Sequence, residues 1–467
     1  MIHPIGVISM DKKIAAIIAA VVVVIIAAAA VTMLGGNDDN KDKEYETGNS
    51  IPVSFSFNNE IRLAIFGNAN GDDYLDQKDV DLLKDILDGK VAYDSKKHCF
   101  ADTNADGKLD AEDVKLLQAL VNKESGNKMY YYDAASSIAS INYPLHGKIA
   151  TYHVYPLDAC IILGLYDDVV GMSNQGFTNS VGRDPSRYPG IGTKIVNIGT
   201  PHEDCQALLA SNANVYLVPW SYDNSTIQKI IDSSNLDLQI VQLPMSKNGP
   251  SIVDQYGALM MLGVMTQTED KAYEYMDFVD KIQDNINSAV SKISGRYTFL
   301  TPMITTSKIE VSLDSPYTSG SMPGDVYTIA KLPMDSVNLV VDSGCPTVSV
   351  EWVIDTNPNV IVVIMFDDYK SSVDDIKKKF NDSLDAYKNT EAYKNGMIFG
   401  VNYYNIANYA GIPTLPLLAS YIWPDLFDEE SSMQMLQQYY EKYTAYENPV
   451  VSQMGNAIVY KMETPSA

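Results

Sequence analysis

Two copies of one acidic loop, 34 residues apart, constrain the fold of this chain more than any other feature. The second copy, residues 102–113, has oxygen-bearing side chains at positions 1, 3, 5, 9 and 12, with glycine at position 6. A loop of this spacing wraps round a calcium ion, and position 7 adds a backbone carbonyl. The pattern predicts a calcium site with the ligands Asp102, Asn104, Asp106, Lys108 (through its carbonyl), Asp110 and Asp113.

The first copy, residues 68–79, predicts a second and weaker calcium site. It begins with a neutral amide instead of a carboxylate, and Asp73 stands where glycine normally relieves the turn. An acidic turn before a surface helix is the simpler interpretation, but two matched copies are far more specific than one. The predicted ligands are Asn68, Asn70, Asp72, Tyr74 (through its carbonyl), Asp76 and Asp79.

Both loops end in aspartate and follow short apolar stretches, RLAIF and KKHCF, whereas a regulatory EF-hand has a preceding helix and a glutamate at position 12. Residues 58–125 resemble a dockerin module, an all-α pair of loop–helix repeats whose helices here are DVDLLKDIL and DVKLLQAL. The resemblance implies two calcium ions and a cohesin-like partner protein that grips one helix face. The partner-facing residues that it implies are Gln77, Lys78, Ala111 and Glu112.

The net charge of −25 over 467 residues disfavours nucleic acid and anionic membrane surfaces as partners. A chain of this length is expected to contain two or three domains. Four cysteines are scattered without metal-ligand spacing, which argues against a disulfide framework or a zinc site.

Residues 14–34 are a run of 21 uncharged residues, which at about 1.5 Å per residue matches the thickness of a bilayer. Lys12 and Lys13 precede the run, so residues 1–13 are expected in the cytoplasm. The linker 35–57 and the bulk of the chain are then extracellular, and the protein is a single-pass protein of the cell membrane. A cleaved signal peptide is the alternative, and either Met1 or Met10 could be the start.

From about residue 126 to 467, apolar runs alternate with helical segments, which is typical of an α/β fold with a parallel sheet. KIATYHV, DVVGMS and NVYLVPW predict strands, and PLDACIILGL and PHEDCQALLASN predict helices. A helical pattern then runs throughout residues 251–293, long enough to connect two lobes. We expect an N-lobe at about 130–250 and a C-lobe at about 294–467, whose strands include YTFLTPMI, NVIVVIMF and GMIFGVN.

Residues 130–467 resemble the bilobal substrate-binding proteins of ABC importers for iron-siderophores, haem and cobalamin. The matching stretches follow the family's order: YPLDACIILGLYDDVVGMS, PHEDCQALLASNANVYLVP, GDVYTIAKLPMDSVNLV, VSVEWVIDTNPNVIVVI and GIPTLPLLASYIWPDLF. The resemblance implies a periplasmic-binding-protein-like domain, little hinge closure and a permease partner. It also implies that Glu203 and Glu351, one per lobe, dock on that permease. Each is expected to begin a helix, where an acid also stabilises the helix dipole.

Ligand contacts are expected where strands end, in the cleft between the lobes. The candidates are Tyr155, Trp220, Tyr222, Asp368, Tyr369, Tyr403 and Tyr404. Their rings suit a large conjugated or metal-chelate ligand, although 31 tyrosines make clusters common by chance. Ferric siderophores often meet arginines, of which the chain has few. A siderophore, haem, a corrinoid and a neutral metal chelate therefore all stay open.

Two other classes of function stay open as well. A dockerin-bearing carbohydrate-active enzyme would need two carboxylates flanking a glycosidic bond, but no motif pairs Glu351, Asp367 or Asp368 with a second acid. A cell-surface adhesion or scaffold protein would use the large domain for recognition alone. The order of anchor, calcium loops and bilobal domain favours an extracellular, membrane-anchored solute-binding protein without catalytic residues.

Overall fold

The structure is a computed structural model that describes residues 45–47, 61–178, 184–245, 252–304, 309–311, 326, 328–338, 346–366 and 371–463. The predicted anchor 14–34 and the candidates Asp368 and Tyr369 lie outside these ranges. Among the helices within them, none is both long and apolar enough to cross a membrane. The chain divides into two compact units, residues 1–43 and 44–467, and all of the described residues belong to the second.

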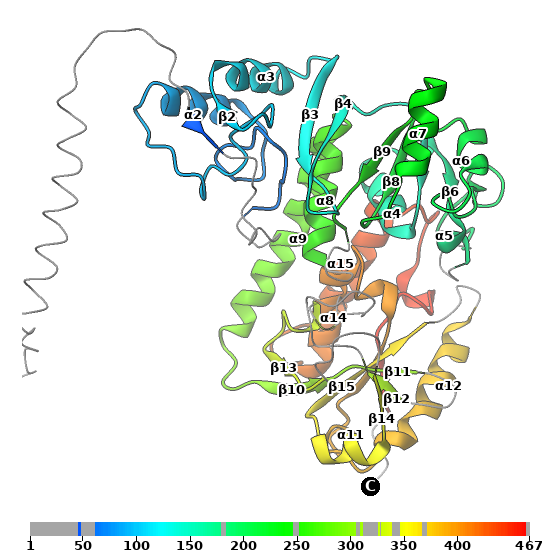
Figure 1. Ribbon diagram of the computed structural model, residues 1–467. Coiled ribbons are helices and arrows are strands. Elements are labelled where there is room, and N and C mark those ends of the chain that lie inside the picture. The colour runs from blue at the N-terminus through cyan, green and yellow to red at the C-terminus, as the bar shows by residue number, and fades with distance from the viewer. Residues whose placement is uncertain are drawn as a thin grey trace, which may run out of the picture. The chain divides into compact units, whose positions relative to one another are not determined.

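Residues 61–125 form the two loop–helix repeats that the sequence predicts (Figure 1). α2 (Gln77–Leu87) and α3 (Ala111–Val121) each begin with a capping box. The side chain of Asp76 accepts a hydrogen bond from a backbone N–H in the first turn of α2, and that of Asp110 does the same for α3. The expectation of an all-α module is wrong in one respect. β1 (Tyr45–Glu46) pairs antiparallel with β2 (Lys108–Leu109), because the second loop offers an extended edge.

The N-lobe begins with a hairpin of β3 (Asn127–Tyr132) and β4 (Ile138–Tyr143). A sheet of order β7-β6-β5-β8-β9 follows, and all of its neighbouring strands run parallel, as predicted. Its strands are β5 (Ile149–Thr151), β6 (Val169–Met172), β7 (Val196–Asn197), β8 (Val215–Val218) and β9 (Gln239–Gln242). Its helices are α4 (Val154–Ile162), η1 (Tyr166–Asp168), α5 (Asn174–Thr178), α6 (Gln206–Ala210) and α7 (Ser225–Ser234).

The predicted helix over PHEDCQALLASN is wrong at its beginning. Residues 201–203 form a turn, and the carboxylate of Asp204 accepts a hydrogen bond from the backbone N–H of Gln206 at 3.0 Å. α6 begins at Gln206, and its N-cap residue is Cys205, which makes no side-chain cap hydrogen bond. Glu203 consequently precedes the helix by three residues instead of beginning it.

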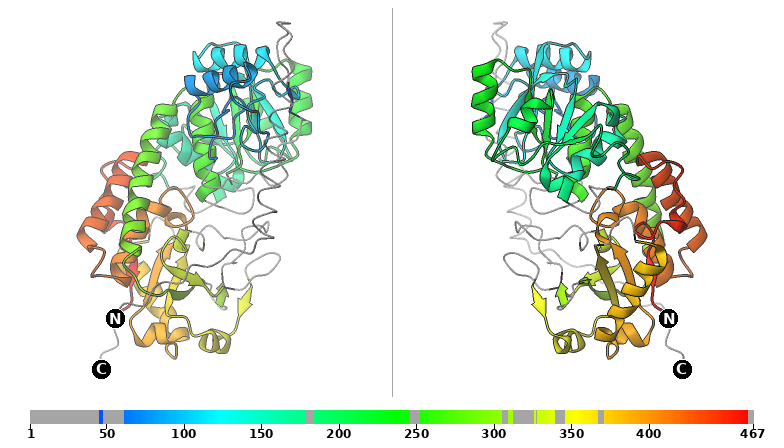
Figure 2. Two further views of the ribbon diagram at one scale, coloured as in Figure 1. Left: turned by 90° about the vertical axis from the view of Figure 1, so that its left-hand side faces the viewer. Right: turned by 90° about the vertical axis from the view of Figure 1, so that its right-hand side faces the viewer.

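The long helix predicted over 251–293 is interrupted. α8 (Ile252–Met265) and α9 (Glu269–Val290) are separated by a break in which Gln267 has a φ of +58°. A Cβ on Gly263 would lie 3.0 Å from Ala272 Cβ, so the glycine lets the two helices approach closely. α9 alone, at about 33 Å, connects the two lobes (Figure 2).

The C-lobe contains an eight-stranded sheet of order β13-β10-β15-β11-β12-β14, in which β16 connects β15 to β17. β15 is completely buried and runs parallel to β10, β11 and β16. The strands are β10 (Tyr297–Leu300), β11 (Pro302–Ile304), β12 (Ile309–Val311), β13 (Met334–Ser336), β14 (Thr347–Val348), β15 (Val360–Met365), β16 (Ile398–Asn402) and β17 (Tyr460–Lys461). The helices are α11 (Val350–Thr356), α12 (Val373–Ser383), η3 (Leu384–Tyr387), α13 (Glu391–Lys394), η4 (Tyr403–Asn405), α14 (Gly411–Ile422), α15 (Glu429–Tyr443) and η5 (Val451–Gln453).

The largest hydrophobic cluster of the described residues connects all parts of the unit, beside smaller clusters within the repeats and within each lobe. It includes Leu63–Phe66, Phe100 and Leu120 of the loop–helix repeats, and it continues through the N-lobe and α8 into α9, α14 and α15. α14 packs against both α9 and α15 (Figure 1). The loop–helix repeats are therefore built into the large domain, and the two lobes share buried side chains.

Candidate functional site: the junction of the lobes

Aromatic rings gather at the carboxyl ends of the N-lobe strands. His153 lies 4.5 Å from Tyr155 and 5.3 Å from Trp220, measured between ring centroids. His202 stacks on Tyr222 at 4.5 Å, with 12° between the ring planes. We call this group the aromatic cluster, and it consists of Tyr152, His153, Tyr155, His202, Trp220 and Tyr222.

His153 is the most unusual member of the aromatic cluster. Its side chain is buried, and its Nδ1 has no hydrogen-bond partner among the described residues. Burial lowers the pKa of His153 to about 4, so the imidazole is neutral at physiological pH. A neutral imidazole has one nitrogen with a free lone pair, which can bind a metal ion. His202 Nδ1 likewise has no partner within the described ranges.

The C-lobe brings its own rings to the same place. Tyr403 follows β16, and its ring stacks on Phe366 at 5.1 Å and meets Tyr404 edge-on at 5.4 Å. Burial raises the pKa of Tyr155 to about 12, and a hydrogen bond with Tyr403 opposes that rise. That bond joins one lobe to the other, so predicted residues from both lobes meet at this junction.

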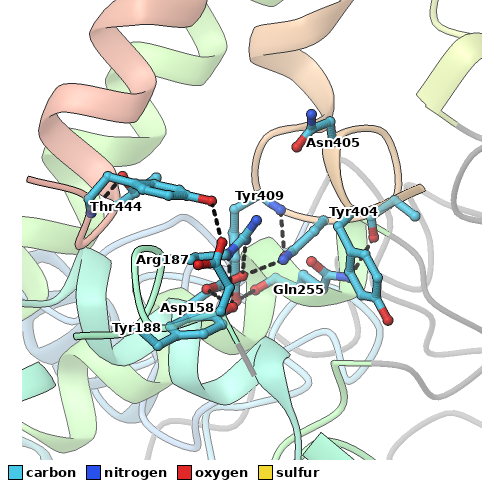
Figure 3. Close-up of polar contacts among 12 residues, drawn as sticks. Asp158, Arg187, Tyr188, Gln255, Tyr404, Asn405, Tyr409 and Thr444 are labelled. Carbon is cyan, nitrogen blue, oxygen red and sulfur yellow. Dashed lines mark hydrogen bonds and ion pairs between the residues drawn. The ribbon is translucent and has the colours of Figure 1, made fainter. Parts of the chain in front are cut away.

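A buried polar network lies at the same junction (Figure 3). Asp158 of α4 forms an ion pair with Arg187 at 2.8 Å, and both side chains are at most 6% exposed. Tyr188 Oη donates a hydrogen bond to Asp158 Oδ1 at 2.7 Å, and Asn408 of the C-lobe donates its amide to Asp158 Oδ2. Removing one partner of such a buried pair costs about 3–5 kcal/mol. The pair itself lies within the N-lobe, and the hydrogen bond from Asn408 extends the network to the C-lobe.

Several of these residues were not predicted from the sequence. Arg187, one of the few arginines of the chain, is buried and paired with Asp158. Asp158 had a recognisable signal, because it is the single charged residue of the apolar segment that forms α4. Tyr152 and His153 follow β5 directly, so the strand-end rule that selected Tyr155 applies to them as well.

The two candidate docking acids are exposed on different lobes. Glu351 is in the first turn of α11, as predicted. A hydrogen bond with its own backbone and another with Ser349 lower its pKa. Glu203 is exposed in the turn before α6. Neither side chain belongs to the aromatic cluster.

The second predicted calcium loop has ordered carboxylates. Asp102 accepts hydrogen bonds from the backbone N–H groups of Asp106 and Gly107, at 3.2 Å and 2.9 Å. Gly107 has a φ of +92°, a backbone conformation that glycine adopts easily. Burial raises the pKa of Asp113 to about 7, and the charge of Asp102 adds to this effect. A bound cation would remove this electrostatic cost, so the residues fit calcium.

The first predicted loop also has the features of an oxygen-ligand site. The Asn68 amide donates hydrogen bonds to the carbonyls of Leu63 and Asp72, both at 2.8 Å. Its Oδ1 is buried and has no partner among the described residues, although most buried polar atoms have one. Position 1 of such a loop supplies calcium with a side-chain oxygen, so this oxygen is available as a ligand. Burial also raises the pKa of Asp79 to about 7.

Within the described part of the chain, no three His, Cys, Asp or Glu side chains converge as closely as a bound metal ion requires. Calcium binding would have to draw the loop oxygens further together. The residues expected to face a cohesin-like partner are all exposed: Gln77, Lys78, Ala111 and Glu112.

Comparison with known proteins supports the fold. No family model matches the chain, and no curated protein sequence matches it. The TroA-like periplasmic binding protein FepB from Veillonella parvula aligns with 72% of this chain and 99% of its own, with a TM-score of 0.54 and 12% identity. The molybdate periplasmic binding protein MolA from Haemophilus influenzae, solved with molybdate bound, aligns with 67% of this chain and 97% of its own, with a TM-score of 0.51 and 16% identity. The chain therefore has the α/β fold of periplasmic binding proteins, which confirms the predicted fold class of the large domain.

Proposed function

We propose that this chain is a solute-binding protein that captures a metal-chelate ligand between its lobes and delivers it to an ABC importer. The observation that carries the proposal is the meeting of the aromatic cluster with Tyr403 and Tyr404 at the carboxyl ends of strands. Ligands of open α/β folds bind at such ends, and flat rings stack on large conjugated molecules. The neutral imidazole of His153 suits a ligand that carries a metal. An iron-siderophore, haem, a corrinoid or a related chelate fits this chemistry.

The proposed ligand site is tested at Trp220. Full-length protein is titrated calorimetrically with haemin, cyanocobalamin and a ferric hydroxamate. We expect one of these probes to bind, and Trp220→Ala to weaken its affinity about tenfold, which is about 1.4 kcal/mol, because a stacking surface is lost. Trp423→Ala is the matched control, since Trp423 stacks on Tyr297 outside the aromatic cluster. Equal losses in the two variants, or no binding of any probe, would argue against this site.

We also propose that the two loops bind calcium and that their exposed helix face docks on a cohesin-like partner. The protein is anchored in the cell membrane through residues 14–34, with the bulk of the chain extracellular, where calcium is abundant. Among the described residues the buried Oδ1 of Asn68 has no hydrogen-bond partner. This oxygen and the buried carboxylates of Asp79 and Asp113 support the calcium sites.

Calcium binding is predicted to depend on pH. Asp79 and Asp113 have pKa values of about 7 without metal, and each must lose its proton to bind calcium. Affinity should therefore be about tenfold lower at pH 6 than at pH 8, with protons released on binding. Titration calorimetry in buffers of different ionisation enthalpy measures both quantities. Asp113→Ala should remove the stronger site and Asn68→Ala the weaker one. Failure to bind two calcium ions at pH 8 would contradict the proposal.

A further inference from the structure

We propose that calcium in the first loop stabilises the linking helix α9, so that this loop acts as a clamp on the bilobal domain. The inference rests on the calcium sites proposed above. It concerns a contact that a freely tethered docking module would not have, namely the packing of residues 68–79 against one side of α9.

An ion bridge connects the first loop to α9. Arg62 pairs with Asp73 in the loop, and its two terminal nitrogens each lie 3.2 Å from a carboxylate oxygen of Asp280 on α9. The planar guanidinium can hold two carboxylates at once, and the Arg62 side chain is 21% exposed, which limits screening by water. Asp73 occupies position 6, where a calcium loop normally has glycine. Asp73, the residue that departs from the usual loop pattern, is therefore also the residue that pairs with Arg62.

A ring contact next to the bridge reinforces it. The ring of Tyr74 lies 4.6 Å from that of Tyr273 on α9, between centroids. Tyr273 also forms a hydrogen bond with the backbone of Leu75. The Tyr74 carbonyl is the predicted calcium ligand, and the Tyr74 ring contacts α9. When calcium fixes the backbone of the loop, it should therefore also fix the contact between this ring and α9.

The second repeat meets α9 differently. Its contact comes from the end of α3, where Lys123 pairs with Glu269 and accepts a hydrogen bond on its carbonyl from Gln267 at 3.1 Å. These residues lie beyond the second loop and beyond its predicted ligands. Calcium in the second loop should therefore have a much smaller effect on α9 than calcium in the first.

Amide hydrogen exchange of the full-length protein, with calcium or with a chelator, tests the proposal. Calcium should slow exchange in peptides from residues 269–290 about tenfold. Asp72→Ala and Asp106→Ala form a matched pair, because each removes the position-5 ligand of one loop. Asp72→Ala should abolish the calcium-dependent protection of α9, whereas Asp106→Ala should leave most of it.

A third variant separates binding from coupling. Arg62→Gln should still bind two calcium ions by calorimetry but lose most of the protection of α9, because the bridge to Asp280 is absent. If wild-type protein binds two ions and exchange in α9 does not change, the clamp is overturned while the calcium sites stand. If wild-type protein binds no calcium, both proposals fall. Equal effects of Asp72→Ala and Asp106→Ala would also overturn the clamp.

Discussion

At the scale of single residues, His153 shows how burial sets chemistry at the lobe junction. Its pKa is lowered to about 4 by burial, from an ordinary value of 6.5. Between these two pH values the unfolded chain binds a proton that the folded protein excludes. The free energy of unfolding should therefore be unaffected by this group above pH 6.5 and should fall by about 3 kcal/mol as the pH drops to 4.

Replacing His153 tests this dependence. His153→Phe keeps an aromatic ring in the cluster and removes the titrating group. The difference in unfolding free energy between wild type and variant, from urea denaturation, should shift by about 3 kcal/mol in favour of the variant between pH 7 and pH 4. His146→Gln, which replaces an exposed histidine outside the aromatic cluster, is the control for removing a histidine. Parallel profiles for wild type and His153→Phe would contradict a buried neutral imidazole.

Single residues also show where sequence reasoning stops. The strand-end rule found Tyr155, Trp220 and Tyr403, because a strand followed by a ring is a local pattern. It did not find the pairing of Asp158 with Arg187, whose partners are 29 residues apart in the sequence. The residues around Arg187 in the sequence do not indicate that its side chain is buried, because burial depends on how the neighbouring elements pack.

At the scale of elements, apolar runs predicted β5, β6, β8, β15 and β16, because buried parallel strands have continuous hydrophobic patterns. The long helix was predicted as one piece, since residues 266–268 carry no proline or glycine to end it. At the break α8 and α9 turn to pack on each other, with Gly263 close to Ala272, and no local residue pattern indicates that contact. Helix α6 is shorter than predicted, because residues 201–203 form a turn and the helix begins at Gln206.

The two candidate docking acids lie near the starts of α6 and α11, and a prediction follows from their positions. Two carboxylates far apart on a rigid body can set the docking register on a permease that offers arginines. Glu203→Ala combined with Glu351→Ala should reduce stimulation of the importer's ATP hydrolysis about tenfold, measured in reconstituted vesicles. Ligand affinity and melting temperature should stay within error of wild type, because both residues are exposed.

A matched control for this pair is Glu430→Ala with Glu441→Ala, which removes two exposed acids from α15. Its stimulation of ATP hydrolysis should equal that of wild type. These residues have another role if the double variant at Glu203 and Glu351 stimulates ATP hydrolysis as strongly as the wild type. The same conclusion follows if the double variant loses ligand binding.

At the scale of the whole molecule, one core connects the loop–helix repeats, both lobes and α9. The sequence predicted separate modules, because each has its own local pattern. It could not show that Leu63–Phe66 and Leu120 pack into the same core as the large domain. This shared core, with the network around Asp158, supports the expectation of little hinge closure.

The central claim is that a metal chelate binds between the lobes. The most direct measurement is mass spectrometry, with metal analysis, of the small molecules retained by full-length protein purified from its own cells. We expect one metal chelate per chain in the wild type and a clear loss of it in Trp220→Ala. A wild-type protein that retains no such molecule and binds none when incubated with extracts of its growth medium would contradict binding of a metal chelate between the lobes.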